Sequence, residues 1–121
     1  MVKTTNQKCY AFGNGIYGQL GVGNNKNSNY PVQVKIDEVT DIAAGENFSL
    51  FLKGTTVYGS GDNSCGQISH ELKKKYALEP LELKIGKATI IRAGKFSAAV
   101  IEDKFVKVWG LKSMTEPIIM N

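Results

Sequence analysis

The chain contains a literal G-x-G-x-x-G pattern at residues 13–18, which is the glycine spacing of a dinucleotide-binding turn. In such a site the glycines must lead into a helix, because the amide groups at the helix N-terminus face the pyrophosphate. The residues that follow, QLGVGNNKNSNYP (19–31), are rich in Gly and Asn and end in Pro, so no helix is expected there. The pattern therefore does not predict a nucleotide site, and we expect no cofactor.

The acid, base and thiol side chains do not form a catalytic or metal-binding set. His70 is the single histidine, which excludes a histidine pair at helical spacing and a histidine-based zinc site. The carboxylate pairs at 37–38 and 102–103 fall at predicted turns, where acidic residues are common. Cys9 and Cys65 form no C-x-x-C pair, so we expect two reduced thiols. We predict no catalytic residues, no metal ligands and no enzymatic activity.

Positive charge gathers in the second half of the chain. The formal net charge is +4, but residues 1–72 carry five Lys against six acidic residues, whereas residues 73–112 carry nine Lys and one Arg against four. Such asymmetry favours contact with an anionic partner, either a nucleic acid or an acidic protein surface. The alternative interpretation is that these lysines keep exposed strand edges soluble, as sheet proteins commonly require.

The sharpest charged feature is a run of three lysines followed by a tyrosine. Such a run on a protruding loop can contact phosphates, and the adjacent ring can stack on a base. A long loop also needs solubilising residues, which is the alternative. The candidate contacts for an anionic partner are Lys73, Lys74, Lys75, Tyr76, Lys84 and Lys87.

The sequence repeats itself with a period of 48 or 49 residues. CYAFGNGIYGQLG (9–21) returns as VYGSGDNSCGQIS (57–69), PVQVKI (31–36) returns as PLELKI (80–85), and IAAG (42–45) returns as IRAG (91–94). Repeats of this length indicate a solenoid or a propeller that is built from one recurring unit.

Each unit is predicted to form four short antiparallel strands. Apolar and polar residues alternate after a proline at 31–36 and 80–85, a pattern typical of a half-buried strand, and three further apolar runs follow in each unit. The runs are separated by only two to four residues, as in tight turns between antiparallel neighbours. We therefore predict an all-β fold, a partial β-propeller with two four-stranded antiparallel blades at about 31–62 and 80–112.

The two ends of the sequence match incomplete units. Residues 8–14 match only a fourth strand and residues 116–121 match only a first strand, so we expect ten strands in a single repeat-built domain, 1–121, with an orphan strand at each end. Closure of a propeller ring removes exposed sheet edges. Because two blades and two orphan strands cannot close a ring, we expect the chain to need a partner.

These residues resemble the regulator of chromosome condensation repeat family, whose unit contains I-A-A-G, a His-Ser-Leu run and V-Y-x-W-G-x-N-x-x-G-Q-L-G. Phe48 and Phe96 stand near the position of that His. The resemblance rests on residues 10–21, 42–50 and 57–67, with Val-Trp-Gly at 108–110 as a further copy. It departs from the family where Ser60 replaces the aromatic residue of the W-G pair, and the third G-Q-L-G segment is missing. The resemblance implies a ring of blades, of which this chain encodes about a third.

The repeat also singles out residues that we expect to determine the fold. Gly45 and Gly94 follow an apolar strand directly before another strand, where a turn or bulge needs positive φ. The same role is expected of the glycine that ends each fourth strand. The repeat-defining residues are Gly13, Gly18, Gln19, Gly21, Gly45, Gly61, Gly66, Gln67, Gly94, Trp109 and Gly110.

Three functions remain open from the sequence. The first, which we favour, is a non-enzymatic interaction module that docks on a protein partner or a large assembly. The second is a small basic protein of a ribonucleoprotein such as the ribosome, binding RNA through 73–112. The third, which the resemblance alone implies, is guanine-nucleotide exchange on a small GTPase or its regulation. Self-association of copies is open as well.

The N-terminal residues MVKTTNQKCY are polar and lack the apolar core of a secretory signal. No run of about 18 apolar residues occurs anywhere in the sequence. We therefore expect an intracellular protein, cytoplasmic or nuclear, with no membrane partner.

Overall fold

The computed structural model describes residues 2–3, 8–69, 74–102, 105–110 and 118–120, and within these ranges the chain forms eleven β-strands and no helix. Accordingly, the described part contains no helix long and apolar enough to cross a membrane. The strands are β1 (Val2–Lys3), β2 (Cys9–Gly13), β3 (Ser28–Gln33), β4 (Asp41–Ala44), β5 (Phe48–Lys53), β6 (Thr56–Asp62), β7 (Tyr76–Leu83), β8 (Ile90–Ala93), β9 (Ser97–Glu102), β10 (Phe105–Gly110) and β11 (Ile118–Met120).

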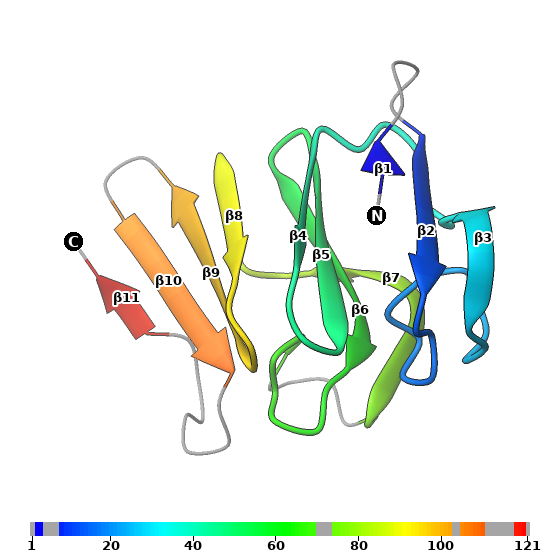
Figure 1. The fold of residues 1–121 in the computed structure, drawn as a ribbon. Coiled ribbons are helices and arrows are strands. Elements are labelled where there is room, and N and C mark those ends of the chain that lie inside the picture. Colours follow the sequence, from blue (N-terminus) through cyan, green and yellow to red (C-terminus); the bar gives the residue numbers. More distant parts are fainter. Residues whose placement is uncertain (1, 4–7, 70–73, 103–104, 111–117, 121) are drawn as a thin grey trace.

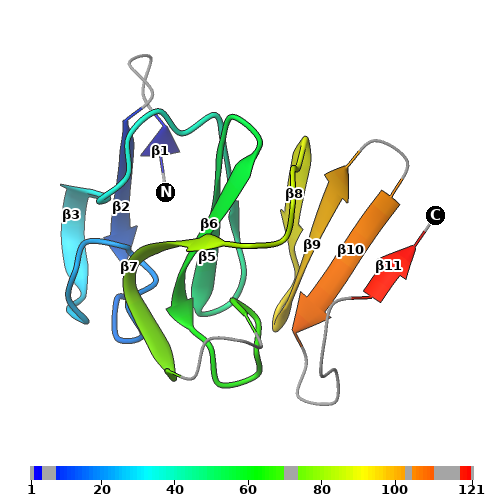
Figure 2. The ribbon, with the colours of Figure 1, turned by 180° about the vertical axis from the view of Figure 1, so that it is seen from behind.

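The strands form three antiparallel sheets that lie side by side (Figures 1 and 2). The first sheet contains β1, β2 and β3, the second contains β4 to β7, and the third contains β8 to β11. In each sheet, strands that follow one another in the sequence are neighbours, which is the meander of a propeller blade. The prediction of an all-β partial propeller with four-stranded antiparallel blades is therefore confirmed.

The strands that make up each blade differ from the predicted blades at 31–62 and 80–112. The strands predicted to start at the prolines begin earlier, and Pro31 and Pro80 lie inside β3 and β7. β3 pairs with β2 and not with β4, and β7 pairs with β6 and not with β8. Each of these strands is therefore the last strand of one blade rather than the first strand of the next, and the second blade runs from Asp41 to Leu83.

The reason for this shift lies in the segment that follows β3. The Val34 amide donates to the Cys9 carbonyl (2.8 Å) and the Lys35 amide donates to the Gly21 carbonyl (2.9 Å), so the segment is held on the first blade. Residues 37–38, predicted to be a tight turn between paired strands, instead belong to a connection that carries the chain to the next blade. These long-range hydrogen bonds leave no trace in the local alternation of apolar residues.

The end segments are not orphan strands. The predicted remnant 8–14 contains β2, which lies between β1 and β3, and the predicted remnant 116–121 contains β11, which pairs with β10. Residues 116, 117 and 121 lie outside the described residues. The prediction of ten strands missed β1, because two residues are too short for any periodic pattern.

The hydrophobic core lies between the sheets as two clusters, and β5 contributes to both. Phe51 belongs to the cluster shared with the first blade, whereas Leu50 and Leu52 belong to the cluster shared with the third, as expected for side chains that alternate across a strand. The β8 strand packs against β4 and β5. The middle blade is therefore covered on both faces, which is how neighbouring propeller blades pack.

The long loops that follow β2 and β6 lie at the same end of the molecule and each contacts the next blade (Figure 1). The Ser60 hydroxyl of the second blade lies within hydrogen-bonding distance of the carbonyls of Gly18 (2.5 Å) and Ala77 (3.0 Å). Trp109, 49 positions later, donates its indole N–H to the carbonyls of Gln67 and Ile68 at 3.0 Å each. The serine that departs from the family pattern therefore contacts the loop of the preceding blade, as the tryptophan does, but at a different carbonyl of that loop.

The glycine after each of these residues lets the loop approach closely. Gly61 has φ +115° and a Cβ there would lie 2.5 Å from the Asn47 carbonyl oxygen; Gly110 has φ +96° and a Cβ would lie 2.6 Å from the Phe96 carbonyl oxygen. In both cases the next nearest neighbour beyond the turn is the Cα of a loop glutamine, at 3.2 Å. No L-residue fits this conformation and this space.

The prediction of positive φ at Gly45 and Gly94 is wrong, since neither has φ in the left-handed region. Both residues close a short turn, with their amides donating to the carbonyls of Phe48 and Ser97 at 2.8 Å. A Cβ at Gly45 would overlap the Phe48 ring, and one at Gly94 would lie 2.9 Å from the Ser97 hydroxyl oxygen. At Gly45 the buried Phe48 ring leaves no space for a side chain, whereas at Gly94 the nearest atom is a hydroxyl that can rotate away.

The interblade contact at Gly61 predicts an unequal effect of two glycine substitutions. Gly54→Ala, at φ +64° with nothing within 4 Å of the added carbon, is expected to cost about 1 kcal/mol of unfolding free energy. Gly61→Ala combines the same backbone strain with overpacking of the added carbon against neighbouring backbone atoms. It is expected to lower the unfolding free energy by about 3 kcal/mol or more. Urea unfolding followed by Trp109 fluorescence measures both, and equal losses would contradict the role assigned to Gly61.

Candidate functional site

A groove on the second blade lies between the loop that follows β2 and the outer strand β7. It has a volume of about 680 Å³. The Gly23 amide donates to the Leu78 carbonyl at 2.9 Å, which holds the loop against β7 and fixes one wall of the groove. The lining residues are Gly23, Asn25, Lys74, Lys75, Tyr76, Ala77, Leu78, Glu79 and Leu81.

The groove exposes large apolar side chains. Tyr76, Leu78 and Leu81 are 45%, 39% and 37% exposed, although all three lie on one strand. The Tyr76 ring packs on the Tyr17 ring, with centroids 5.7 Å apart, so the loop of the first blade supports it. The groove therefore presents an apolar wall that is already in place before a ligand arrives.

The charge at the groove is positive. Lys74 and Lys75 are exposed, and neither ammonium makes an ion pair within the described part of the chain. Glu79 also lines the groove, but its carboxylate lies 3.8 Å from the Lys35 ammonium, which offsets its charge. The uncompensated charges are thus the two lysines.

The backbone edge of β7 is a poor template for an added strand. The Leu78 carbonyl is already occupied by the Gly23 amide, and Pro80 has no N–H to donate. A ligand in the groove would therefore be recognised by side chains and not by strand addition.

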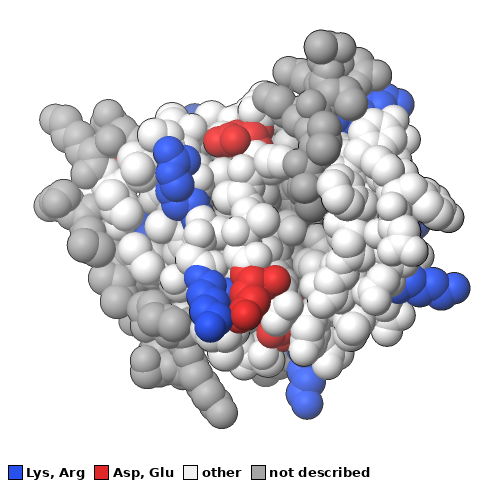
Figure 3. Space-filling model, viewed as in Figure 1, with Lys and Arg blue, Asp and Glu red and all other residues white. Residues whose placement is uncertain are grey.

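The structure gathers only some of the predicted contacts for an anionic partner. Lys74, Lys75 and Tyr76 line the groove, whereas Lys84 and Lys87 are exposed on the connection between β7 and β8, and Lys73 lies outside the described residues. On the face shown in Figure 3, Lys and Arg side chains are separated by uncharged surface. The basic half of the sequence is thus not one continuous patch on that face.

Sequence reasoning missed the apolar part of the groove. The alternation at 80–85 placed Leu81 on the buried face with Leu83, but Leu81 is 37% exposed and Leu83 is 6% exposed. Leu78 was assigned no role. One feature of the sequence could have indicated that Leu78 and Leu81 are exposed. Both lie on a strand that contains a proline, and such strands usually lie at a sheet edge.

The repeat-defining residues of the long loops act within the framework. The Gln19 side-chain oxygen accepts from the Tyr17 amide (2.9 Å) and the Gln67 oxygen accepts from the Cys65 amide (2.8 Å). Both glutamines are buried, and Gly18, Gly21 and Gly66 in the same loops have positive φ. Each glutamine folds its own loop into the shape that contacts the next blade.

The described residues contain no cluster of three or more His, Cys, Asp or Glu side chains that could hold a metal ion, and His70 lies outside them. The G-x-G-x-x-G segment at 13–18 begins no helix; it forms turns in which the Gly18 amide donates to the Gly15 carbonyl at 2.9 Å. Its amides therefore do not form the helix terminus that a pyrophosphate site requires.

The two thiols have different environments. Cys9 is fully buried in the cluster between the first two blades, and loss of solvation raises the pKa of its thiol from 9.0 to about 11. Cys65 lies in the long loop after β6 and is partly exposed. Neither thiol is paired in a disulfide.

The burial of Cys9 predicts both its reactivity and its contribution to pH dependence. At pH 8, a disulfide reagent is expected to modify Cys65 in the folded protein and to reach Cys9 only after unfolding. Because the pKa is raised in the folded state, this thiol stabilises the fold below pH 9 and the stabilisation declines as the pH rises from 9 towards 11. Comparing the unfolding free energy with that of Cys9→Ala across this range isolates the effect, and parallel curves would contradict it.

The meander sheets, the interblade loops and the two core clusters define the chain as part of a propeller of repeated blades. Two family models with the description "Regulator of chromosome condensation (RCC1) repeat" match residues 6–52 and 39–67. The chain belongs to the regulator of chromosome condensation (RCC1) repeat family.

The chain is similar to much longer curated proteins. It is 33% identical over 109 residues to an X-linked retinitis pigmentosa GTPase regulator homolog of Caenorhabditis elegans, a match that covers 84% of this chain and 8% of that protein. It is 32% identical over 117 residues to the human X-linked retinitis pigmentosa GTPase regulator, covering 90% of this chain and 12% of that protein. The chain thus spans about a tenth of the length of these relatives.

Solved structures share the fold over nearly the whole chain. Human WBSCR16 superimposes with a TM-score of 0.87 at 21% identity, covering 98% of this chain and 34% of that one. Prp20p of Saccharomyces cerevisiae superimposes with a TM-score of 0.85 at 18% identity, covering 98% and 35%. The chain therefore spans about a third of the length of these solved chains.

Proposed function

We propose that this chain is a non-enzymatic interaction module that binds a protein partner through the groove beside β7. The observation that carries the proposal is that exposed Tyr76, Leu78 and Leu81 lie next to Lys74 and Lys75 in one groove. Exposed apolar residues with charged neighbours are typical of protein interaction sites. Catalysis would need a set of reacting side chains, for which the groove supplies only two lysines, one glutamate and one phenol.

The groove favours a partner surface that is acidic and carries an apolar anchor. Lys74 and Lys75 would attract carboxylates and speed association, while Leu78 and Leu81 would bury an apolar side chain of the partner. Since the edge of β7 is blocked, the partner is expected to dock as a folded surface or a loop rather than as an added strand.

The names of similar proteins support a protein partner. Two relatives are described as GTPase regulators. The structure of Prp20p was described with its binding to Gsp1p and histones, and a further structure shows yeast RCC1 (Prp20) bound to Kap60. Because histones are basic, the lysines of this groove suit an acidic surface on another protein, such as a GTPase, better.

A charge-reversal pair tests the proposal. Lys74→Glu/Lys75→Glu changes the groove, and Lys84→Glu/Lys87→Glu makes the same change of charge at exposed lysines outside it. Binding is measured for the unchanged chain, the groove variant and the control variant. The probes are purified Gsp1p and the proteins that the immobilised chain captures from an extract. We expect the groove variant to weaken binding by about tenfold or more and the control variant by about twofold or less.

Two outcomes would overturn the proposal. Equal losses in both variants would show that binding follows net charge and not the groove. The groove variant could instead lose binding to a single-stranded RNA oligonucleotide while its binding to proteins stays unchanged. This result would favour the ribonucleoprotein function, and the RNA binding of the unchanged chain should then fall steeply with salt.

A further inference from the structure

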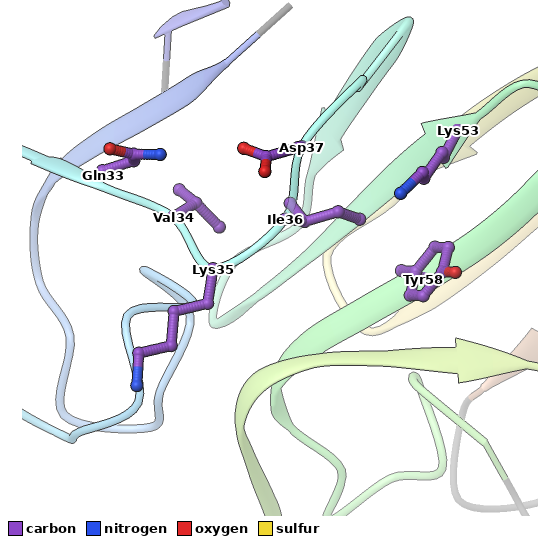
Figure 4. Close-up of a pocket in the computed structure, with 7 residues that line it drawn as sticks. All are labelled: Gln33, Val34, Lys35, Ile36, Asp37, Lys53 and Tyr58. Atoms are coloured by element: carbon purple, nitrogen blue, oxygen red, sulfur yellow. The ribbon is translucent and has the colours of Figure 1, made fainter.

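A second pocket lies between the first two blades, where the connection after β3 faces the β5–β6 hairpin (Figure 4). Its volume is about 430 Å³. Val34 and Ile36 are buried at its base, and Lys53 and Tyr58 are half-buried. Gln33, Lys35 and Asp37 complete the lining. None of these residues lines the groove beside β7.

The repeat places a different pair of side chains at the equivalent positions of the third blade. The positions 49 residues after Lys53 and Tyr58 are Glu102 and Lys107. The β5–β6 and β9–β10 pairs have the same register, since Phe51 lies opposite Tyr58 in the first and Val100 lies opposite Lys107 in the second.

At these positions of the third blade the two side chains form an ion pair. The Lys107 ammonium donates to the Ile85 carbonyl at 2.5 Å and lies 3.9 Å from a Glu102 carboxylate oxygen. Ile85 is the equivalent of Ile36, 49 positions later. The equivalent space is therefore one that a partly buried cation and carboxylate share.

The first pocket has lost this balance of charge. A lysine stands where the glutamate would be, and a tyrosine stands where the lysine would be. Within the described part of the chain Lys53 makes no ion pair. The Asp37 carboxylate points away from Lys53 and towards Gln33, and Lys35 points out of the pocket (Figure 4). Lys53, a half-buried residue, thus has no ion-pair partner among the described residues, and it lies in one pocket with a phenol and two buried apolar side chains.

We propose that this pocket binds a carboxylate carried on a short aliphatic chain. The carboxylate would take the place of the missing acidic partner, accepting hydrogen bonds from the Lys53 ammonium and the Tyr58 hydroxyl. The aliphatic chain would lie over Val34 and Ile36. A small aliphatic acid and a glutamate side chain of another protein both have this chemistry.

Direct titration tests the pocket with defined probes. Hexanoate and the peptide acetyl-Gly-Glu-Gly-amide are titrated against the whole chain by NMR, and hexanol is the uncharged control. We expect saturable shifts of the Val34, Ile36 and Tyr58 signals with a dissociation constant of about a millimolar or below for at least one acid. The tighter probe identifies the source of the carboxylate. No saturable shift with either acid, or equal binding of hexanol, would overturn the proposal.

Matched variants test the role of Lys53. Lys53→Gln is expected to weaken binding of the acid by about tenfold, and Lys35→Gln, an exposed lysine of the same pocket, by about twofold or less. Equal effects of the two variants would contradict the assignment of Lys53.

A double variant can introduce the ion pair of the third blade into the pocket between the first two blades. Lys53→Glu/Tyr58→Lys reproduces the pair found at 102 and 107, and we expect it to abolish acid binding while retaining the fold, as reported by Trp109 fluorescence. If the folded double variant still binds hexanoate with unchanged affinity, the acid lies elsewhere. These results do not depend on the groove beside β7, so either proposal can fail alone.

Discussion

Each blade is joined to the next by a loop whose backbone carbonyls accept hydrogen bonds from side chains of the following blade. Ser60 lies within hydrogen-bonding distance of the Gly18 carbonyl and Trp109 donates to the Gln67 carbonyl, and both loops approach a glycine that no other residue can replace. A hydroxyl and an indole differ greatly in size, yet both contact the loop of the preceding blade. The geometry of the backbone at this contact, more than the identity of one side chain, sets the position of each blade against its neighbour.

Both candidate sites lie at the seam between the first two blades. The groove needs the loop after β2 on one side and β7 on the other, and the pocket needs the connection after β3 and the β5–β6 hairpin. A repeat architecture explains this placement, because positions that pack the blades recur while positions along the seam are free to differ. The change from Glu102 and Lys107 to Lys53 and Tyr58 is one such difference, and it puts a lysine and a tyrosine in the pocket where the next seam has an ion pair.

The candidate groove was predictable from the sequence only in part. The run that includes Lys74, Lys75 and Tyr76 is visible as adjacent letters, so its charge and its aromatic ring could be identified without a structure. Leu78 and Leu81 could not, because an apolar residue on a short strand is expected to face a core. Whether it does depends on what covers the strand, and β7 is the outer strand of its sheet.

The sequence by itself determined the period and most of the short strands, since these follow from the recurrence of residues and from the alternation of apolar and polar side chains. The tertiary structure alone decided which blade each proline-containing strand joins. Segment 34–36 follows β3 directly in the sequence, but what holds it on the first blade are the carbonyls of Cys9 and Gly21, far back in the chain. Hydrogen bonds over such distances form only when the blades have packed, so the boundaries of the blades, and the sites along their seam, belong to the folded protein.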